Sequence, residues 1–443
     1  MNRRLNILLI QPRWMGLSYR RKIKVNERRI HPLSLGVVAT LSGDHTIKII
    51  DEAIENVPKD TSMFDIVGIS VNTYTAPRAF QLADTLLQRK NTVILGGVHT
   101  SLNPDECLLH ASSIIIGDAE DTWPPLLEDF IHNNLKDKYI SSNRMSGKDI
   151  PAPRRDLFKR MKRRVAYCQI SRGCSNQCRF CYLQYMPSKT FRLRDIDDVY
   201  NELKSLDERI ILFVDDNLFC DREYLIEFLK RIAPLGKRWW IQAPTDIYND
   251  EELISLLSGS GCFSLSIGFQ TALEANNFNE SIFQNKVDNY KKLVNLLHKY
   301  GILVDGTFIF GFDGDTKDTF RKTEELIRFL GIDTYTFYLL TPYPGTTYFE
   351  YFFKEKRILT SDLSFYDWDH AVIRPKNMAE CELIKGVEEL YDRLDKTYYL
   401  KNIIKNIRIY NKKVFSRDLL FFLLSLGWNY RVSNKSPQFF NHQ

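Results

Sequence analysis

The chain has 443 residues, of which 44% are hydrophobic and 26% charged, and its formal net charge is +6. This length accommodates two or three domains with filled cores, and the composition is that of an ordinary globular protein. No stretch holds the roughly 18 apolar residues that a membrane-spanning helix needs. The first apolar run, 5–10, is too short for a secretory signal, so we expect a cytoplasmic protein.

Five short runs rich in β-branched residues occur in the first 120 residues, with helical stretches such as 77–90 between them. Because nearly every position in them is apolar, they suit strands buried on both faces of a parallel sheet. The alternation predicts a doubly wound α/β domain over 1–138. Glycines at the strand ends suit a ligand site, although turn chemistry alone also explains any single glycine. The five runs are 5–10, 46–51, 66–71, 92–97 and 113–118.

A polar, basic and proline-bearing stretch over 139–165 indicates a linker. A second alternation of strands and helices follows over 166–345, and its six units predict a partial or full parallel barrel. Ligands of such a barrel lie at the C-terminal ends of its strands. The six expected strands are 166–171, 210–216, 238–244, 262–269, 306–312 and 334–340.

The last part of the chain, 346–443, is expected to be mostly helical. A basic segment over 401–417 is followed by an apolar segment over 419–428. A surface helix packed on the core is the simpler interpretation, and peripheral contact with a membrane or a lipid-like substrate is the alternative. The basic runs lack the interleaved aromatic residues of a nucleic-acid groove, so we expect no nucleic-acid partner.

Three of the eight cysteines, Cys174, Cys178 and Cys181, lie within eight positions in "RGCSNQCRFCY" (172–182). Structural zinc needs four ligands, and this triplet has neither a second cysteine pair nor a nearby histidine. Three thiolates on a four-iron cluster would leave one iron open to an outside ligand. The triplet therefore predicts a [4Fe–4S] cluster that binds something. The other five cysteines are scattered and suit core packing.

The stretch "CSNQCRFCY" resembles the signature of radical S-adenosylmethionine (SAM) enzymes. The resemblance implies that the open iron is chelated by the amino and carboxylate groups of SAM. It also implies that the reduced cluster cleaves SAM to a 5′-deoxyadenosyl radical, with an external one-electron reductant such as flavodoxin or ferredoxin. Tyr182 occupies the family's aromatic position against adenine.

Further motifs resemble the same family. "FVDDNLF" (213–219) ends the second barrel strand, where the family places polar groups near the methionyl amino group, although a solvated Asp pair is equally consistent. At the end of the fourth strand, where many relatives carry a Glu-Ser pair, this chain has an amide that can still bond ribose hydroxyls but carries no charge. "LTPYPGT" (340–346) resembles the last-strand motif. The SAM contacts that these motifs imply are Asp215, Asp216, Gln242, Gln270 and Gly311.

The N-terminal domain resembles that of cobalamin-binding radical enzymes, above all over 96–127. The Asp-x-His-x-x-Gly motif of many cobalamin proteins is missing from the corresponding loop, 11–21. His31 and His99 suit surface or turn positions, so we expect cobalamin to be held without a protein imidazole. The implied cobalamin contacts are Ser70, Thr73, Gly96, Gly97, Gly117 and Glu120.

Three functions are compatible with these features. The first is cobalamin-dependent methylation of an unactivated carbon in a small-molecule or lipid-like substrate; the chain's tail loosely resembles hopanoid-methylase-like members. The second is a radical cyclisation, oxidation or carbon–carbon coupling without functional cobalamin. The third, an iron–sulfur redox module, explains neither the open iron nor the barrel motifs. No motif identifies a catalytic residue or the substrate.

Overall fold

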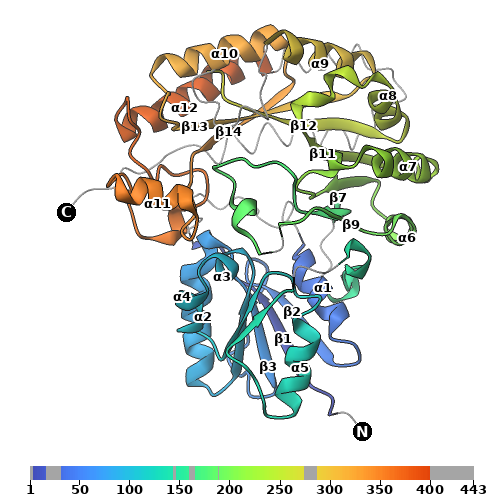
Figure 1. The fold of residues 1–443 in the computed structure, drawn as a ribbon, viewed down its shortest axis with the longest axis vertical. Helices are drawn as coiled ribbons and strands as arrows, with labels where there is room; N and C mark the ends of the chain where they lie inside the picture. The colour runs from blue at the N-terminus through green and yellow to red at the C-terminus, as the bar shows by residue number, and fades with distance from the viewer. Residues whose placement is uncertain are drawn as a thin grey trace.

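The computed structural model describes residues 3–15, 31–142, 146–158, 165–187, 189–273 and 287–399. These residues form two α/β units, one above the other, with a loop-rich layer between them (Figure 1). Strands of both units point their ends toward this layer. None of the helices in the described parts of the chain combines the length and apolar character required to cross a membrane.

The N-terminal unit contains a six-stranded sheet in the order β2-β1-β3-β4-β5-β6, with every pairing parallel. Five strands lie where the sequence predicts them. The sixth, Lys138–Ile140, pairs with β5 through Ile116 and Ile140, so the sheet extends past the expected boundary at 138. The strands are β1 Asn6–Gln11, β2 Thr46–Asp51, β3 Ile66–Ser70, β4 Thr92–Gly96, β5 Ser113–Ile116 and β6 Lys138–Ile140.

Helices cover both faces of this sheet, which confirms the doubly wound prediction. Alternate side chains of one strand enter different cores: Leu8 of β1 packs on the face that also buries Ala79 of α2. Leu9 of β1 packs on the opposite face with Trp123 of α5. The helices are α1 Leu33–Leu41, α2 Ala76–Gln88, α3 Val98–Leu102, α4 Pro104–Leu108 and α5 Trp123–Ile131, and the short η3 spans Thr73–Thr75.

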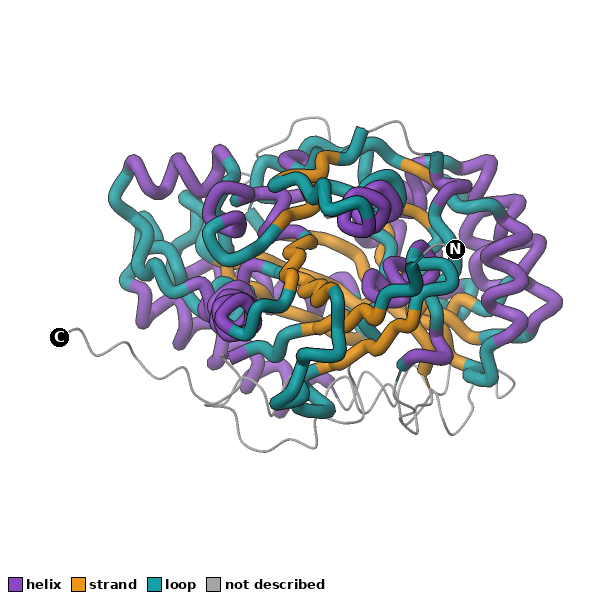
Figure 2. Tube along the Cα trace, turned by 90° about the horizontal axis from the view of Figure 1, so that it is seen from below, coloured by secondary structure: helices purple, strands orange, loops and turns teal. Residues whose placement is uncertain are grey.

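The second unit contains six parallel strands in the order β14-β13-β12-β11-β10-β7. Since β7 and β14 are the two edges, the sheet is an open partial barrel, as expected. Figure 2, seen from below, shows the strands in the middle of the molecule and helices on either side of them. The strands are β7 Val165–Cys168, β10 Ile210–Phe213, β11 Arg238–Ala243, β12 Cys262–Gln270, β13 Leu303–Phe310 and β14 Thr334–Leu339. The helices are α6 Ile196–Ser205, α7 Arg222–Ile232, α8 Glu251–Gly259, α9 Val287–Lys299 and α10 Asp318–Leu330.

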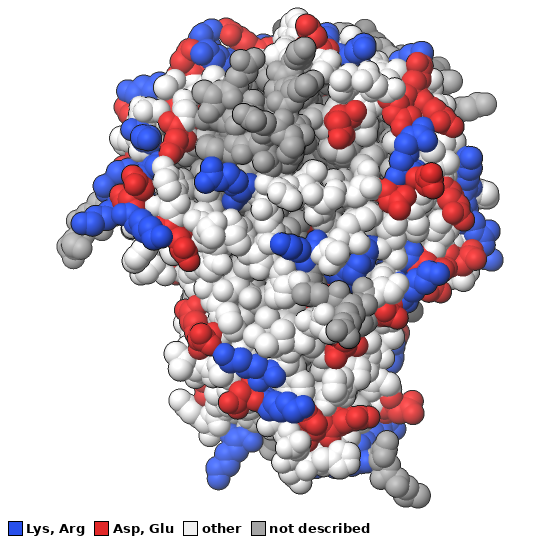
Figure 3. Space-filling view, in the orientation of Figure 1, with Lys and Arg blue, Asp and Glu red and all other residues white. Residues whose placement is uncertain are grey.

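Beyond β14 the described chain is partly helical, with α11 at Thr347–Lys354, α12 at Glu380–Leu394 and a π-helical turn at Asp395–Tyr399. Helix α12 packs against α10 through residues such as Leu383 and Phe320, which share the barrel core. The basic and apolar segments 401–417 and 419–428, and with them the predicted membrane contact, lie outside the described residues. On the face in Figure 3, basic and acidic side chains are interspersed around the margins.

Candidate functional site

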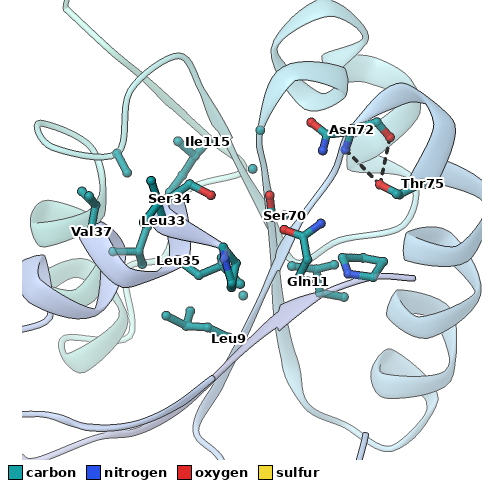
Figure 4. Close-up of a pocket in the computed structure, with 18 of the residues that line it drawn as sticks. Leu9, Gln11, Leu33, Ser34, Leu35, Val37, Ser70, Asn72, Thr75 and Ile115 are labelled. Atoms are coloured by element: carbon teal, nitrogen blue, oxygen red, sulfur yellow. Dashed lines mark hydrogen bonds between the residues drawn. The ribbon is translucent and has the colours of Figure 1, made fainter. Parts of the chain in front are cut away.

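A cavity of about 700 Å³ lies at the carboxyl edge of the N-terminal sheet. The strand order places β2 and β3 on opposite sides of β1, so the connections turn opposite ways there and open a crevice where such folds bind ligands. Figure 4 shows Gln11 and Ser70, from the ends of β1 and β3, facing this space across from residues of α1. The barrel unit contributes Gln169, Arg172 and Val214 to the lining. The cavity therefore touches both units.

Five of the six expected cobalamin contacts line this cavity: Ser70, Gly96, Gly97, Gly117 and Glu120. The sixth, Thr73, is fully buried and is not part of the lining, and its hydroxyl lies 3.4 Å from Nδ1 of His99. The structure thus places Thr73 behind the cavity wall, because the short helix η3 turns its side chain inward. Its loop reaches the cavity through Asn72, Tyr74 and Thr75.

The glycines of these loops differ in what they do. Gly97 has φ 116°, and a Cβ there would lie 2.8 Å from the carbonyl oxygen of Val71, so the backbone itself requires glycine. Gly96 has no such constraint, since its Cβ would meet only the Cβ of Ile115 at 3.6 Å. Gly96 therefore leaves space beside the cavity that a side chain could fill.

The two histidines lie in different surroundings. His99 is completely buried, with Nε2 3.1 Å from Oε2 of Glu106, so the expectation of a surface or turn residue is wrong for it. This hydrogen bond lowers the pKa of Glu106 and joins α3 to α4. His31 lines the cavity with its ring stacked 4.9 Å from that of Phe158. No motif surrounds His31, so the sequence gives no signal that would place it in the cavity lining.

The cysteine triplet lies on a loop whose two ends are tied together by a short antiparallel ladder, β8 Ser171–Arg172 with β9 Arg192–Leu193. Gly173 begins the loop at φ 81°, where a Cβ would lie 2.5 Å from the carbonyl oxygen of Thr190. After the third cysteine the loop contains the short helix η6, Tyr182–Tyr185. The ladder and the glycine fix the loop close to the C-terminal end of β7.

The three thiols suit a cluster by their chemistry. All are free and partly buried. The Asn176 backbone N–H and the Asn217 side-chain amide donate to Sγ of Cys174 at 3.4 and 3.6 Å, as donors to a metal-bound thiolate do. No three His, Cys, Asp or Glu side chains in the described residues are grouped as one ion requires. The three cysteines therefore fit a cluster by the chemistry of their sulfur atoms, although these side chains are not gathered around one metal ion.

Burial raises the pKa of the Cys178 thiol to about 11 and that of Cys181 to about 12. Thiols with these pKa values are protonated at neutral pH, so binding iron must displace their protons. Cys220, assigned from sequence to core packing, is instead partly buried beside the loop and accepts a hydrogen bond from Ser175 Oγ at 3.2 Å. It comes from η7, Leu218–Cys220, directly after the "FVDD" strand end.

The two aspartates after β10 both face the cluster loop. Oδ1 of Asp215 accepts from the N–H of Ile170 at 2.9 Å and from the N–H and hydroxyl of Ser171, the latter at 2.8 Å. Asp216 accepts from the N–H of Gly173 at 2.9 Å. Desolvation raises the pKa of both carboxyls. Each therefore positions the chain ahead of Cys174, and contact with the SAM ammonium remains a prediction.

A buried ion network joins the two units beside this loop. The Arg172 guanidinium lies 2.8 Å from Glu120 and 3.4 Å from Asp118, and Arg192 also pairs with Asp118. The side chain of Glu120 is 2% exposed. Glu120, expected to contact cobalamin, is thus held by an arginine two residues before Cys174.

The remaining expected SAM contacts lie at the ends of their strands. Gln242 is exposed on β11. Gln270 ends β12 at φ 60° beside an irregularity in its pairing with β13, an unusual backbone state of a kind that clusters at functional sites. Gly311 follows β13 at φ 110°, and its N–H donates to Asp315 at 2.7 Å. Tyr182 stacks on Tyr343 at 5.6 Å, in the last-strand motif.

Comparison with known proteins assigns the family. The radical SAM superfamily matches residues 168–327. The bacteriochlorophyllide d C-12(1)-methyltransferase of Chlorobaculum tepidum is 32% identical over 81% of each chain. This chain belongs to the radical SAM superfamily. The bacteriochlorophyllide d C-8(2)-methyltransferase of the same organism is 26% identical and covers 92% of this radical SAM chain and 96% of its own.

Solved structures show the same two-unit fold. The cobalamin-dependent radical SAM enzyme OxsB has a TM-score of 0.66 at 14% identity, over 97% of this chain and 72% of its own. The methyltransferase TsrM from Kitasatospora setae has a TM-score of 0.61 at 17% identity, over 78% and 77%. As a radical SAM enzyme, the protein uses a [4Fe–4S] cluster and SAM, and Cys174, Cys178 and Cys181 are the residues that would hold the cluster.

Proposed function

We propose that this radical SAM enzyme is a cobalamin-dependent methylase that adds a methyl group to an unactivated carbon of a tetrapyrrole. One observation carries the proposal: the 700 Å³ cavity is lined both by the expected cobalamin loops and by Arg172, two residues before the first cluster cysteine. A cofactor in this cavity would thus lie beside the radical-forming loop. A vestigial domain would not need to keep such a cavity open.

The chemistry belongs to the cofactors, and the chain positions them. When bound, the reduced cluster and SAM supply a 5′-deoxyadenosyl radical, and methylcobalamin supplies a methyl group. Asp215 and Asp216 hold the turn ahead of Cys174, and Arg172 connects it to the cavity loop at Glu120. The stacked rings of Tyr182 and Tyr343 place apolar surface directly after Cys181.

Relatives support the substrate class. Two bacteriochlorophyllide d methyltransferases match 81% and 96% of their own lengths. The hopanoid C-3 methylase of Methylococcus capsulatus is 25% identical over 77% of its length. Because the tetrapyrrole enzyme of higher identity exceeds the hopanoid enzyme on both measures, we favour a tetrapyrrole over a lipid. The proposal includes a cytoplasmic location and an external flavodoxin- or ferredoxin-type reductant.

The test is anaerobic reconstitution with iron, sulfide and methylcobalamin, followed by gel filtration and assay with SAM, a reductant and bacteriochlorophyllide d. We expect cobalamin to co-elute, 5′-deoxyadenosine to form, and the substrate to gain the mass of one methylene unit. Formation of 5′-deoxyadenosine with no retained cobalamin and no mass gain would favour a cyclisation, oxidation or coupling. A mass gain on a hopanoid alone would exclude the tetrapyrrole.

A further inference from the structure

A continuous series of aromatic rings runs from the cavity to the cluster loop. Trp14 and Tyr74 line the cavity, and their ring centroids are 5.8 Å apart. Trp368 lies 5.7 Å from Tyr74 and 5.9 Å from Tyr343, which in turn stacks on Tyr182. Both units and the segment after β14 contribute rings. The series thus connects the lining of the cavity with the loop that carries the three cysteines.

Trp368 is the unusual member of this series. It adopts φ 66°, which is costly for a bulky side chain, and 38% of its surface is exposed although its neighbour Asp367 is buried. Its carbonyl accepts the N–H of Leu339, the last residue of β14, at 2.7 Å. Asp367 also accepts two backbone N–H groups, from residues 369 and 370. A backbone conformation of a kind that clusters at functional sites therefore holds an exposed indole in a fixed place.

The ring orientations suggest what this indole binds. The Trp368 and Tyr343 rings are inclined by only 32°, whereas the Tyr74 ring stands at 63° to Trp368. A flat ligand stacked on the indole would have a floor beneath it and a wall at its edge. Since Tyr74 belongs to the cavity lining, that edge would lie next to the cavity. A ring substrate methylated at its periphery needs this arrangement.

The segment that carries Trp368 is also fixed to the N-terminal unit. Nε1 of Trp14 donates to the carbonyl oxygen of Ser364 at 3.2 Å. Leu363 packs among the apolar residues of the α2 face of the N-terminal sheet and also against the cluster around Tyr343. These contacts therefore hold the indole at a fixed distance from the cavity before any ligand binds.

We propose that Trp368, supported by the buried ring of Tyr343 and bordered by Tyr74, forms the subsite that stacks on the flat conjugated ring of the substrate. This assignment rests on the methylase function proposed above and specifies how that site recognises a macrocycle. Stacking on a preorganised aromatic ring favours planar π-systems over saturated polycycles, which lack a π-face. Trp368 is thus a specificity-determining residue for a tetrapyrrole.

The test uses the anaerobic holoenzyme and zinc protoporphyrin IX, whose own fluorescence polarisation reports binding. Trp368→Asn removes the ring but tolerates the left-handed backbone, and Trp368→Phe keeps an aromatic ring. We expect the Asn variant to bind about tenfold more weakly and the Phe variant to bind like the wild type. Iron and cobalamin contents should be unchanged in both. Phe329→Ala is the matched control, since this ring on α10 is 55% exposed.

Equal affinity of the Trp368→Asn variant and the wild type, or an equal loss in the Phe329→Ala control, would overturn the assignment. Displacement of the porphyrin by a saturated pentacyclic triterpene at similar concentration would overturn the preference for planar rings. The two proposals fail separately. Porphyrin binding through Trp368 without cobalamin retention would contradict only the methylase, and methylation without porphyrin binding would contradict only the subsite.

Discussion

At the residue scale, the position of the cluster loop depends on side chains that hydrogen-bond its backbone as well as on the cysteines that would bind iron. Asp215, Asp216 and Gly173 all act on the few residues ahead of Cys174. Asn176 and Asn217 donate to its sulfur. The sequence pattern predicts the three ligands, whereas Asp215, Asp216 and Asn217, which hydrogen-bond the loop, come from the end of another strand, β10.

We predict that replacing Cys174, Cys178 and Cys181 together by Ala removes about four irons per chain and the brown colour. Cys220→Ala should keep both, although its thiol lies beside Ser175. Iron and sulfide analysis after anaerobic reconstitution measures this. A triple variant that keeps its iron would contradict the cluster site. Loss of iron in Cys220→Ala would add Cys220 to the ligand set.

Asp215 makes stability depend on pH. Burial raises its pKa from 3.8 to about 7 in the folded protein. Between these values the folded state holds a proton that the unfolded state has released, so this stabilising contribution is full below pH 3.8 and is lost as pH rises through 7. The loss is on the order of a few kcal/mol. Between pH 5 and pH 8 the melting temperature of the Asp215→Asn variant should therefore fall less than that of the wild type. Parallel curves of melting temperature against pH would show that Asp215 does not titrate in this range.

At the element scale, the carboxyl ends of the N-terminal strands form the cavity, and their glycines have distinct tasks. Gly97 and Gly117 adopt left-handed backbone that other residues disfavour. Gly97→Leu would therefore disturb the contact with Val71 as well as the cavity, and any loss of cobalamin would be ambiguous. A substitution at Gly96 tests the cavity alone, because only Ile115 would lie within 4 Å of the added Cβ.

We predict that Gly96→Leu greatly reduces cobalamin retention while iron content and 5′-deoxyadenosine formation persist, because the added side chain fills space that the corrin needs. Gly259→Leu on α8 is the control, since nothing lies within 4 Å of its Cβ position. Absorbance of the purified holoenzyme gives the cobalamin-to-protein ratio. Full cobalamin retention in the Gly96→Leu variant would indicate that cobalamin binds outside this cavity.

The elements that sequence predicts well are those whose signal is local. Long apolar runs such as 92–97 give strands within a residue or two, because burial on both faces leaves no polar positions. Strand β6 is missed because it has three residues and two of them are exposed. The positions of Thr73 and His99 are also missed, since a short helix and a buried polar pair turn them inward. Trp368 carries no local signal, because its role depends on rings distant in the chain.

At the scale of the whole molecule, the two units are joined where their sites meet. Arg172 and Arg192, from the ladder that closes the cluster loop, pair with Asp118 and Glu120 from the cavity edge. Asn103 of the N-terminal unit also donates to the carbonyl oxygen of Pro344 in the last-strand motif at 3.0 Å. Because these charges are mostly buried, the pairs resist solvent screening and fix one unit against the other.

Arg172 should therefore govern how the two units unfold. Arg172→Leu leaves the buried carboxylate of Glu120 without its arginine and removes one of the two arginines that pair with Asp118. Breaking a buried pair in this way typically costs about 3–5 kcal/mol. We expect a single thermal transition in the wild type and two separate transitions in the variant, measured by circular dichroism on matched holoenzyme samples. Arg231→Leu, which breaks an exposed pair with Asp197, should shift the curve little.

Adding Glu120→Leu to Arg172→Leu should restore part of the loss, since apolar side chains can replace a buried ion pair at little cost. One unshifted transition in Arg172→Leu would mean that the network does not couple the units, and failure of the second substitution to restore stability would assign the loss to packing instead of charge.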